Sequence, residues 1–490
     1  MKCAMSLPHL PAELTLDIIE RLDPASTLHL ALSSKAQFKL CEDRLKVHAT
    51  LFEKYSVIRP SNNGYFIWDI TIEILKDPWK GWYVRELDLV SNRPEECPAE
   101  HITDEDGCIL RAAVRQLEHL YPPKSEFFVA EYFDLKKLFD MMDEEINAGY
   151  EAPILVLLVH YLPWLQTFRM TDKRMGEAFL TFIRGVAAGY QNPAIIKEMP
   201  LQHLRLAAIA HCDTESHCCT DWAVYFVCIP SLKTFTAFMM GSEDSGLYEG
   251  DQEAHLRNTA RHPVSNVEEL VFNGCQFGPD SFDTLLPLIK NLKRFKYDAG
   301  GHIVAEGQDV EPRKVIRALL AHAGHSLEEL SLAEVCIDFE LQGFNEEDIR
   351  SVPVKDFKKL KALHCEAKWL ICEPSDLVDG TDSEDEGIPD KDRQLLAKYR
   401  IKPLTHEVKD PRDNLPKSLE YLYLDGLYIG DEWDEIVEMF KTTNPRTPKL
   451  LENFCLNRDG DAAWGQAAEP EARFANPLLE DIWKGHNYFL

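Results

Sequence analysis

A six-residue pattern organises most of the chain and is first met at Val84-Arg85-Glu86-Leu87-Asp88-Leu89. Its form is apolar-x-x-apolar-x-apolar, and the last two apolar positions alternate as they do on a strand with one buried face. Ten copies occur, beginning at Val84, Leu165, Leu201, Leu232, Val267, Leu292, Leu327, Phe357, Leu419 and Leu451. We therefore expect a series of short strands.

The spacing of the copies leaves room for helices between them. Most copies begin 25 to 36 residues apart, and intervals of 81 and 62 residues are long enough for additional units. Three amphipathic helices are predicted, one with Phe282, Leu285, Leu286 and Ile289 after Gly278-Pro279, one with Val315, Ile316, Leu319 and Leu320, and one with Trp433, Ile436, Val437 and Phe440 after Asp431. A single strand–loop–helix unit cannot bury its apolar side, so neighbouring units must stack.

The N-terminal head, residues 6–55, has a different pattern. It predicts three short helices, with Asp23 and Ser34 as N-caps of the second and third. The apolar positions are Leu14, Ile18, Ile19 and Leu22 in the first helix, Leu28, Ala31 and Leu32 in the second, and Phe38, Cys41, Leu45 and Phe52 in the third. So few large side chains make a marginal core. Either a partner completes the head, or the head is a small cap on the following domain.

The ordered features of the head resemble an F-box. They are Leu10-Pro11, the spaced aliphatic residues, Asp23-Pro24 and Ser34-Lys35, with Phe38 where many F-boxes have Trp. The resemblance implies docking on the Skp-type adaptor of a cullin–RING ubiquitin ligase. It assigns the adaptor-facing surface, or its support, to seven residues: Leu10, Pro11, Leu14, Ile18, Leu22, Leu28 and Leu32.

The body resembles the irregular leucine-rich repeats found behind the F-box in many fungal proteins. Asn92, Cys275 and Cys365 stand where that repeat places Asn or Cys, three residues after the last apolar position. The expected fold is α/β, with a three-helix F-box at 6–55, an aromatic junction at 56–83, a strand–helix solenoid at 84–457 and a tail and cap at 458–490. An ordinary α/β domain is the alternative. Segment 373–393 is expected to be a solvated acidic loop, in which Ser383 resembles a site for an acidophilic kinase.

Charge and cysteine content limit the partners and the compartment. The chain of 490 residues has a net charge of −29, of which residues 1–60 contribute +1. This disfavours nucleic acids and anionic membranes as main partners and favours a target with a basic patch. The 13 cysteines form no Cys-x-x-Cys pair, which suggests free thiols in the cytoplasm or nucleus. No secretory signal is evident, and the aliphatic run from Pro153 to Leu162 is too short to span a membrane.

Few residues suggest chemistry. His211, Cys212, His217, Cys218 and Cys219 are close in sequence, but their irregular spacing does not favour a zinc site. No phosphate-binding loop, His-Glu-x-x-His helix or Gly-x-Ser-x-Gly turn is present in the sequence. We therefore expect no cofactor, no metal and no catalytic residue.

The predicted function is the recruitment of a target protein to a cullin–RING ubiquitin ligase. The head would bind the adaptor, the body would bind the target, and the target itself is not identified. Two alternatives remain open: an adaptor-binding scaffold with no part in ubiquitylation, and an enzyme on an α/β fold.

Overall fold

The computed structural model describes residues 10–60, 65–90, 101–120, 135–172, 177–191, 193, 195–211, 217–241, 264–277, 281–299, 312–333, 354–366, 411–425, 439, 453–458 and 461–464. It divides into two compact units, Met1–Ala207 and Ala208–Leu490. The division falls within strand β4, and each unit has its own buried residues.

The first unit begins with the three helices of the head and continues with alternating strands and helices. Its elements are α1 (Ala12–Arg21), α2 (Pro24–Ser33), α3 (Lys35–Tyr55), β1 (Val57–Ile58), α4 (Phe66–Lys76), η2 (Pro78–Tyr83), β2 (Glu86–Leu89), α5 (Asp104–Leu120), α6 (Leu135–Ala148), α7 (Ala152–His160), β3 (Thr167–Asp172), α8 (Ala178–Tyr190) and the start of β4 (Leu206–His211). Strands β1, β2 and β3 are parallel neighbours.

Helix α7 is the centre of the helical layer of the first unit. Every residue from Ala152 to Val159 is buried, and α4, α6 and α8 pack around this helix. The chain that follows α7 lies so close to η2 that a Cβ atom at Gly81 would be 2.1 Å from the carbonyl oxygen of Tyr161. No helix within the described residues is both long enough and apolar enough to span a bilayer.

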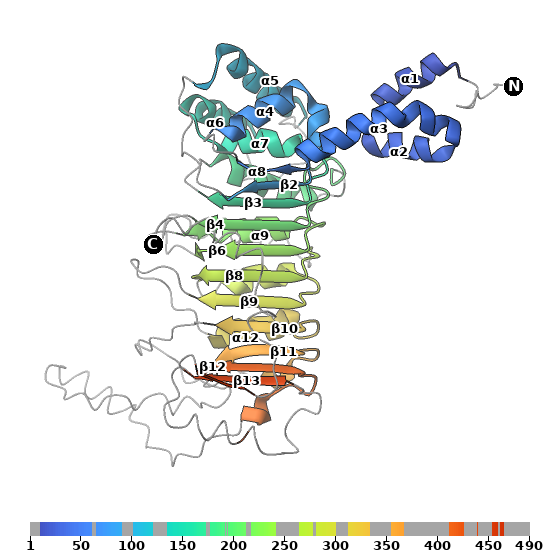
Figure 1. Ribbon diagram of the computed structural model, residues 1–490. Helices are drawn as coiled ribbons and strands as arrows, with labels where there is room; N and C mark the ends of the chain where they lie inside the picture. The colour runs from blue at the N-terminus through green and yellow to red at the C-terminus, as the bar shows by residue number, and fades with distance from the viewer. Residues whose placement is uncertain are drawn as a thin grey trace. The chain divides into compact units, whose positions relative to one another are not determined.

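The second unit is built on a parallel sheet. Its elements are β5 (Cys218–Cys219), α9 (Asp221–Val227), β6 (Thr234–Phe238), β7 (Met240–Gly241), β8 (Glu269–Cys275), α11 (Ser281–Leu285), η5 (Leu286–Leu288), β9 (Arg294–Ala299), α12 (Pro312–Ala323), β10 (Glu329–Ala333), η6 (Val354–Asp356), β11 (Ala362–Glu366), η8 (Pro411–Asn414), β12 (Tyr421–Asp425), β13 (Asn453–Arg458) and β14 (Asp461–Trp464). Strands β6 and β8 to β13 pair in sequence order and run in one direction (Figure 1). Only β14 in this row is antiparallel to its neighbour.

Aromatic side chains fill the space between the sheet and the helices of the second unit. Phe272 on β8 lies between Phe235 on β6 and Phe295 on β9, with ring centroids 6.3 Å and 6.1 Å away. Phe226 from α9 and Phe282 from α11 pack against these rings. All five side chains are buried, so this unit closes its own core.

All ten copies of the sequence pattern coincide with strands, which confirms that part of the prediction. They correspond to β2, β3, β4, β6 and β8 to β13 in chain order. Two copies, however, were assigned to the wrong register. The amides of Lys361 and Ala362 donate to the carbonyl oxygen of Glu328, which makes Leu360 the first apolar position, three residues after Phe357. The amides of Arg205 and Leu206 donate to the carbonyl oxygen of Gln166 in the same way, so the first apolar position of that copy is Leu204 and not Leu201.

The physical reason for both errors is an extra apolar residue three positions before the true first apolar position of the copy. Leu201 and Phe357 are themselves buried, so the pattern fits either frame equally well. The same type of backbone contact identifies a further copy of the pattern, ahead of the ten found in the sequence. The amides of Arg85 and Glu86 donate to the carbonyl oxygen of Ser56, which places Tyr55-Ser56-Val57-Ile58 in register before β2. The expected junction at 56–83 therefore contains a strand, a helix and a 3-10 helix.

The predicted helices are found where the structure describes them. Helix α12 buries Val315, Ile316 and Leu319 as expected. The helix predicted around Phe282 is only five residues long and ends as the 3-10 turn η5, because Pro287 has no amide hydrogen for a helical bond. The helix predicted after Asp431, Asn92, the acidic loop 373–393 with Ser383, and the tail after 464 lie outside the described residues.

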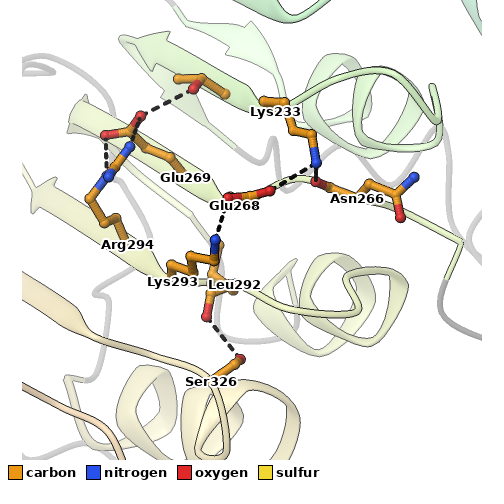
Figure 2. Close-up of polar contacts among 9 residues, drawn as sticks. Lys233, Asn266, Glu268, Glu269, Leu292, Lys293, Arg294 and Ser326 are labelled. Carbon is orange, nitrogen blue, oxygen red and sulfur yellow. Dashed lines mark hydrogen bonds and ion pairs between the residues drawn. The ribbon is translucent and has the colours of Figure 1, made fainter.

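Charged side chains of alternating sign line the second positions of successive copies in the second unit. This charge ladder comprises Lys233, Glu268, Lys293, Glu328 and Lys361, and Figure 2 shows its first half. Glu268 bridges two strands, since its carboxylate oxygens lie 2.8 Å from Lys233 Nζ and 2.6 Å from Lys293 Nζ. Lys361 pairs with Glu328 at 3.4 Å. These pairs link the copies at β6, β8 and β9 to one another, and the copy at β10 to the copy at β11.

Candidate partner-binding surface

The three helices of the head form as their capping residues predict. The Asp23 carboxylate accepts a hydrogen bond from the Ser26 amide at 2.9 Å, and Pro24 occupies the first helical position of α2. The hydroxyl of Ser34 accepts a bond from the Gln37 amide at 3.2 Å and starts α3. Both predicted N-caps are therefore confirmed.

The core of the head is small. Ile19, Ala31 and Cys41, one from each helix, form its buried centre. Leu30, Leu40 and Leu45 pack partly against it. One isoleucine and two small side chains bury little apolar area, so this core stabilises the head only weakly by itself.

Large apolar side chains are exposed on the head. Of the nine that the described residues expose, seven lie in α1 to α3: Leu14, Leu16, Leu28, Leu32, Phe38, Val47 and Phe52. Leu32 is 72% exposed and Leu28 47%. They are four residues apart on α2 and share one face, next to the face that buries Thr27 and Ala31. Exposed apolar residues concentrated on one module are typical of a binding surface.

The seven residues assigned to the adaptor divide into two groups. Four of them are exposed, namely Pro11, Leu14, Leu28 and Leu32. The other three, Leu10, Ile18 and Leu22, are half-buried. Phe38, which we quoted only as a departure from the family pattern, is 49% exposed and belongs to the first group. The exposure of Leu14 could not be predicted, because its helix turns Thr15 and Ile19 inward instead.

A buried histidine joins the head to the rest of the first unit. Nε2 of His48 on α3 lies 3.3 Å from the hydroxyl of Thr27 on α2, and its Nδ1 contacts the hydroxyl of Tyr83 in η2. Burial, followed by the nearby charge of Arg44, lowers the pKa of His48, while Asp23 acts weakly in the opposite direction. The imidazole is therefore neutral at pH 7 and bridges two hydroxyl groups.

The end of α3 is held by a second polar cluster. The Glu73 carboxylate on α4 accepts hydrogen bonds from the Tyr55 hydroxyl and from Lys80 Nζ, the latter at 2.9 Å. Lys54 Nζ is 3.5 Å from the same carboxylate. The second half of α3 is thus anchored to α4 and η2, while α1 and α2 pack on its first half (Figure 1).

Four charged residues, three on strands β2 and β3 and one directly after β1, balance one another. Arg59 lies 3.0 Å from Glu86 and 3.3 Å from Asp88, and Arg169 lies 3.7 Å and 3.5 Å from the same carboxylates. Burial raises the pKa of Asp88, although both arginines oppose that effect. The cluster is neutral as a whole and holds the strands together.

The described histidines and cysteines among those considered for zinc are His211, His217, Cys218 and Cys219. His211 is buried at the end of β4, Cys218 and Cys219 form β5, and Cys212 lies outside the described residues. No group of three or more His, Cys, Asp or Glu side chains that could hold a metal ion occurs in the part of the chain described. Cys275 is fully buried, and burial raises the pKa of its thiol to about 12.

Comparison with protein-family models and with curated proteins finds no match to this chain.

Proposed function

We propose that the chain is the substrate-recruiting subunit of a cullin–RING ubiquitin ligase, with the head docking on a Skp-type adaptor. One observation carries the proposal. The module with the F-box-like sequence is also the module whose core is incomplete and whose leucines are exposed. Burial of Leu28 and Leu32 by a partner would contribute about 1.5–3 kcal/mol of favourable free energy for each side chain.

The mechanism is positional. The head fixes the chain to the ligase, and the body holds a target protein, so that target lysines are presented to the ubiquitin-loaded enzyme at high effective concentration. No residue of this chain takes part in bond making or breaking. The coincidence of ten pattern copies with ten strands, and the parallel pairing within each unit, support a leucine-rich-repeat body for this role.

The test is affinity capture of a purified Skp-type adaptor by the full chain. We expect the double variant Leu28→Ser/Leu32→Ser to lose at least tenfold in affinity, because it removes two apolar anchors without disturbing the buried core. The matched control is Val57→Ser/Trp79→Ser, which removes exposed apolar surface outside the three helices and should bind normally. Equal binding by all three proteins would refute docking through α2.

A scaffold without a role in ubiquitylation is the second candidate, because the same exposed leucines would serve it. Recovery of the cullin together with the adaptor distinguishes the two. If the adaptor is captured from cells and the cullin is not, the recruiting function is wrong and the scaffold is favoured. Replacement of Leu10 and Pro11 by Ala tests the start of the head in the same assay.

A further inference from the structure

The first unit carries a continuous row of aromatic rings along the turns that precede its strands. Trp79 and Trp82 of η2 have ring centroids 5.5 Å apart, and Trp82 lies 6.5 Å from Trp164, which precedes β3. Trp164 stacks on His203, which precedes β4, at 4.2 Å and an interplanar angle of 14°. We call these four residues the aromatic stripe. Trp79 and His203 are exposed, and Trp82 and Trp164 are half-buried.

Two arginines lie along this stripe. The guanidinium carbon of Arg85 is 5.9 Å from the ring centroid of Trp164 and 5.6 Å from that of Phe52. Arg205 is exposed two residues after His203, and its amide bonds to the carbonyl oxygen of Gln166 beside Trp164. Burial, then the positive charges of Arg85 and Arg205, lower the pKa of His203, which places both cations near its ring.

These arginines differ from the two in the charged cluster at β1 to β3. Arg59 and Arg169 are paired with Glu86 and Asp88. Within the described residues, by contrast, Arg85 bonds only to the carbonyl oxygens of Trp82 and Val84, and Arg205 has no carboxylate partner. Among the described residues, Arg85 and Arg205 therefore lie beside the aromatic stripe without a carboxylate partner, in a chain whose net charge is −29.

We propose that the aromatic stripe binds an acidic, proline-containing segment of a partner protein in extended conformation. Carboxylates of the segment would pair with Arg85 and Arg205, and proline rings would lie on the exposed rings of Trp79 and His203 at the two ends of the stripe. Tryptophan-lined surfaces bind extended proline-containing segments in this way, because such segments lose little entropy on binding.

The dimensions fit a short segment. The ring centroids along the stripe are 5.5, 6.5 and 4.2 Å apart, so the stripe is at most about 16 Å long. About five residues of extended chain span that length. Two cations suit a peptide with two or three carboxylates. A nucleic acid strand would be repelled by the acidic remainder of the chain, and its affinity rests on many more phosphate contacts.

The experiment is fluorescence anisotropy on the full chain, with a labelled twelve-residue peptide of alternating Glu and Pro as the probe. We expect it to bind at least tenfold more tightly than the matched Gln-Pro and Lys-Pro peptides, and to weaken as salt rises. The variant Arg205→Glu should bind the Glu-Pro peptide at least tenfold more weakly and should now prefer the Lys-Pro peptide. Arg205 is exposed, so this variant is expected to fold normally.

Two controls make the result specific. Arg115→Glu reverses the charge of an exposed arginine on α5 and should change binding less than twofold. Leu28→Ser/Leu32→Ser should also leave peptide binding within twofold, so failure of adaptor docking and failure of this inference remain separable. The inference is overturned if the three peptides bind equally, if Arg115→Glu weakens binding as much as Arg205→Glu, or if single-stranded oligo(dT) binds more tightly than the acidic peptide.

Discussion

The head and the second unit use apolar side chains in opposite ways. In the second unit, Phe235, Phe272 and Phe295 stack inside the sheet–helix layer, and none of its described large apolar residues is exposed. In the head, a small core of Ile19, Ala31 and Cys41 leaves Leu14 and Leu32 outside. Both regions have amphipathic sequences. The difference shows that an apolar stripe predicts a buried face without specifying which molecule buries it.

The largest effect should come from the core of the second unit. Phe272→Ala removes the ring that contacts both neighbouring strands and should lower the free energy of unfolding by about 3–5 kcal/mol. Chemical denaturation of the full chain, followed by circular dichroism, measures it. The control is Phe38→Ala in the head, where the ring is exposed and the change should stay within about 0.5 kcal/mol. Similar losses in both variants would contradict the comparison.

A smaller and more local loss is expected in the core of the head. Ile19→Ala leaves only Ala31 and Cys41 at the centre of the head. It should lower the free energy of unfolding by about 2 kcal/mol, the lower end of the range for such a substitution, because three loosely packed helices can relax around the cavity. Hydrogen exchange should show faster exchange in α1 to α3 and unchanged protection in β8 and β9. Leu16→Ala, at an exposed position of the same helix, is the matched control. Uniform loss of protection would mean that the head shares its core with the body.

Much of this contrast follows from local sequence, and part of it does not. Asp23, Pro24 and Ser34 define the helix starts, because capping is decided within four residues. The strands follow from alternation. Register is less certain, since Leu201 and Phe357 extend the apolar pattern by three residues and only the backbone bonds of Gln166 and Glu328 select the frame.

The candidate surfaces depend on contacts that are distant in sequence. Leu14 and Ile19 both fit the apolar face of α1, and only packing against the other helices of the head turns Ile19 inward. The aromatic stripe brings together Trp82, Trp164 and His203 from turns that are up to 121 residues apart, one ahead of each of three strands. Trp164 and Trp82 lie one and two residues before the first apolar position of their copies, which is a signal in the sequence, whereas His203 directly precedes its copy only in the register that starts at Leu204.

The pH dependence of the head tests its attachment. The lowered pKa of His48 means that the unfolded chain binds a proton first as the pH falls below the ordinary value of 6.5. The stabilisation by neutral His48 is therefore complete above pH 6.5 and declines as the pH falls toward the folded pKa. Exchange of α3 amides should accelerate between pH 7 and pH 5.5, after correction for the intrinsic rate.

His48→Gln is the control for that titration. Glutamine can bond to Thr27 and Tyr83 but does not titrate, so the additional acceleration at low pH should disappear. An identical pH profile in the variant would assign the effect to another group.

The smallest effect is expected at the charge ladder. Glu268→Gln removes the charge that bridges Lys233 and Lys293, and because all three side chains are more than a third exposed, the loss should be only about 0.5–1 kcal/mol. The hydrogen bonds from the two lysines lower the pKa of Glu268 from 4.5 to about 2. Its contribution is thus present above pH 4.5 and lost as the pH falls toward 2. Glu328→Gln, which breaks a single pair at 3.4 Å, should cost less. The bridging charge does not stabilise the stacked copies if the two variants lose the same free energy of unfolding, or if 1 M salt leaves the effect of Glu268→Gln unchanged. In that case the aromatic core alone distinguishes this unit from the head.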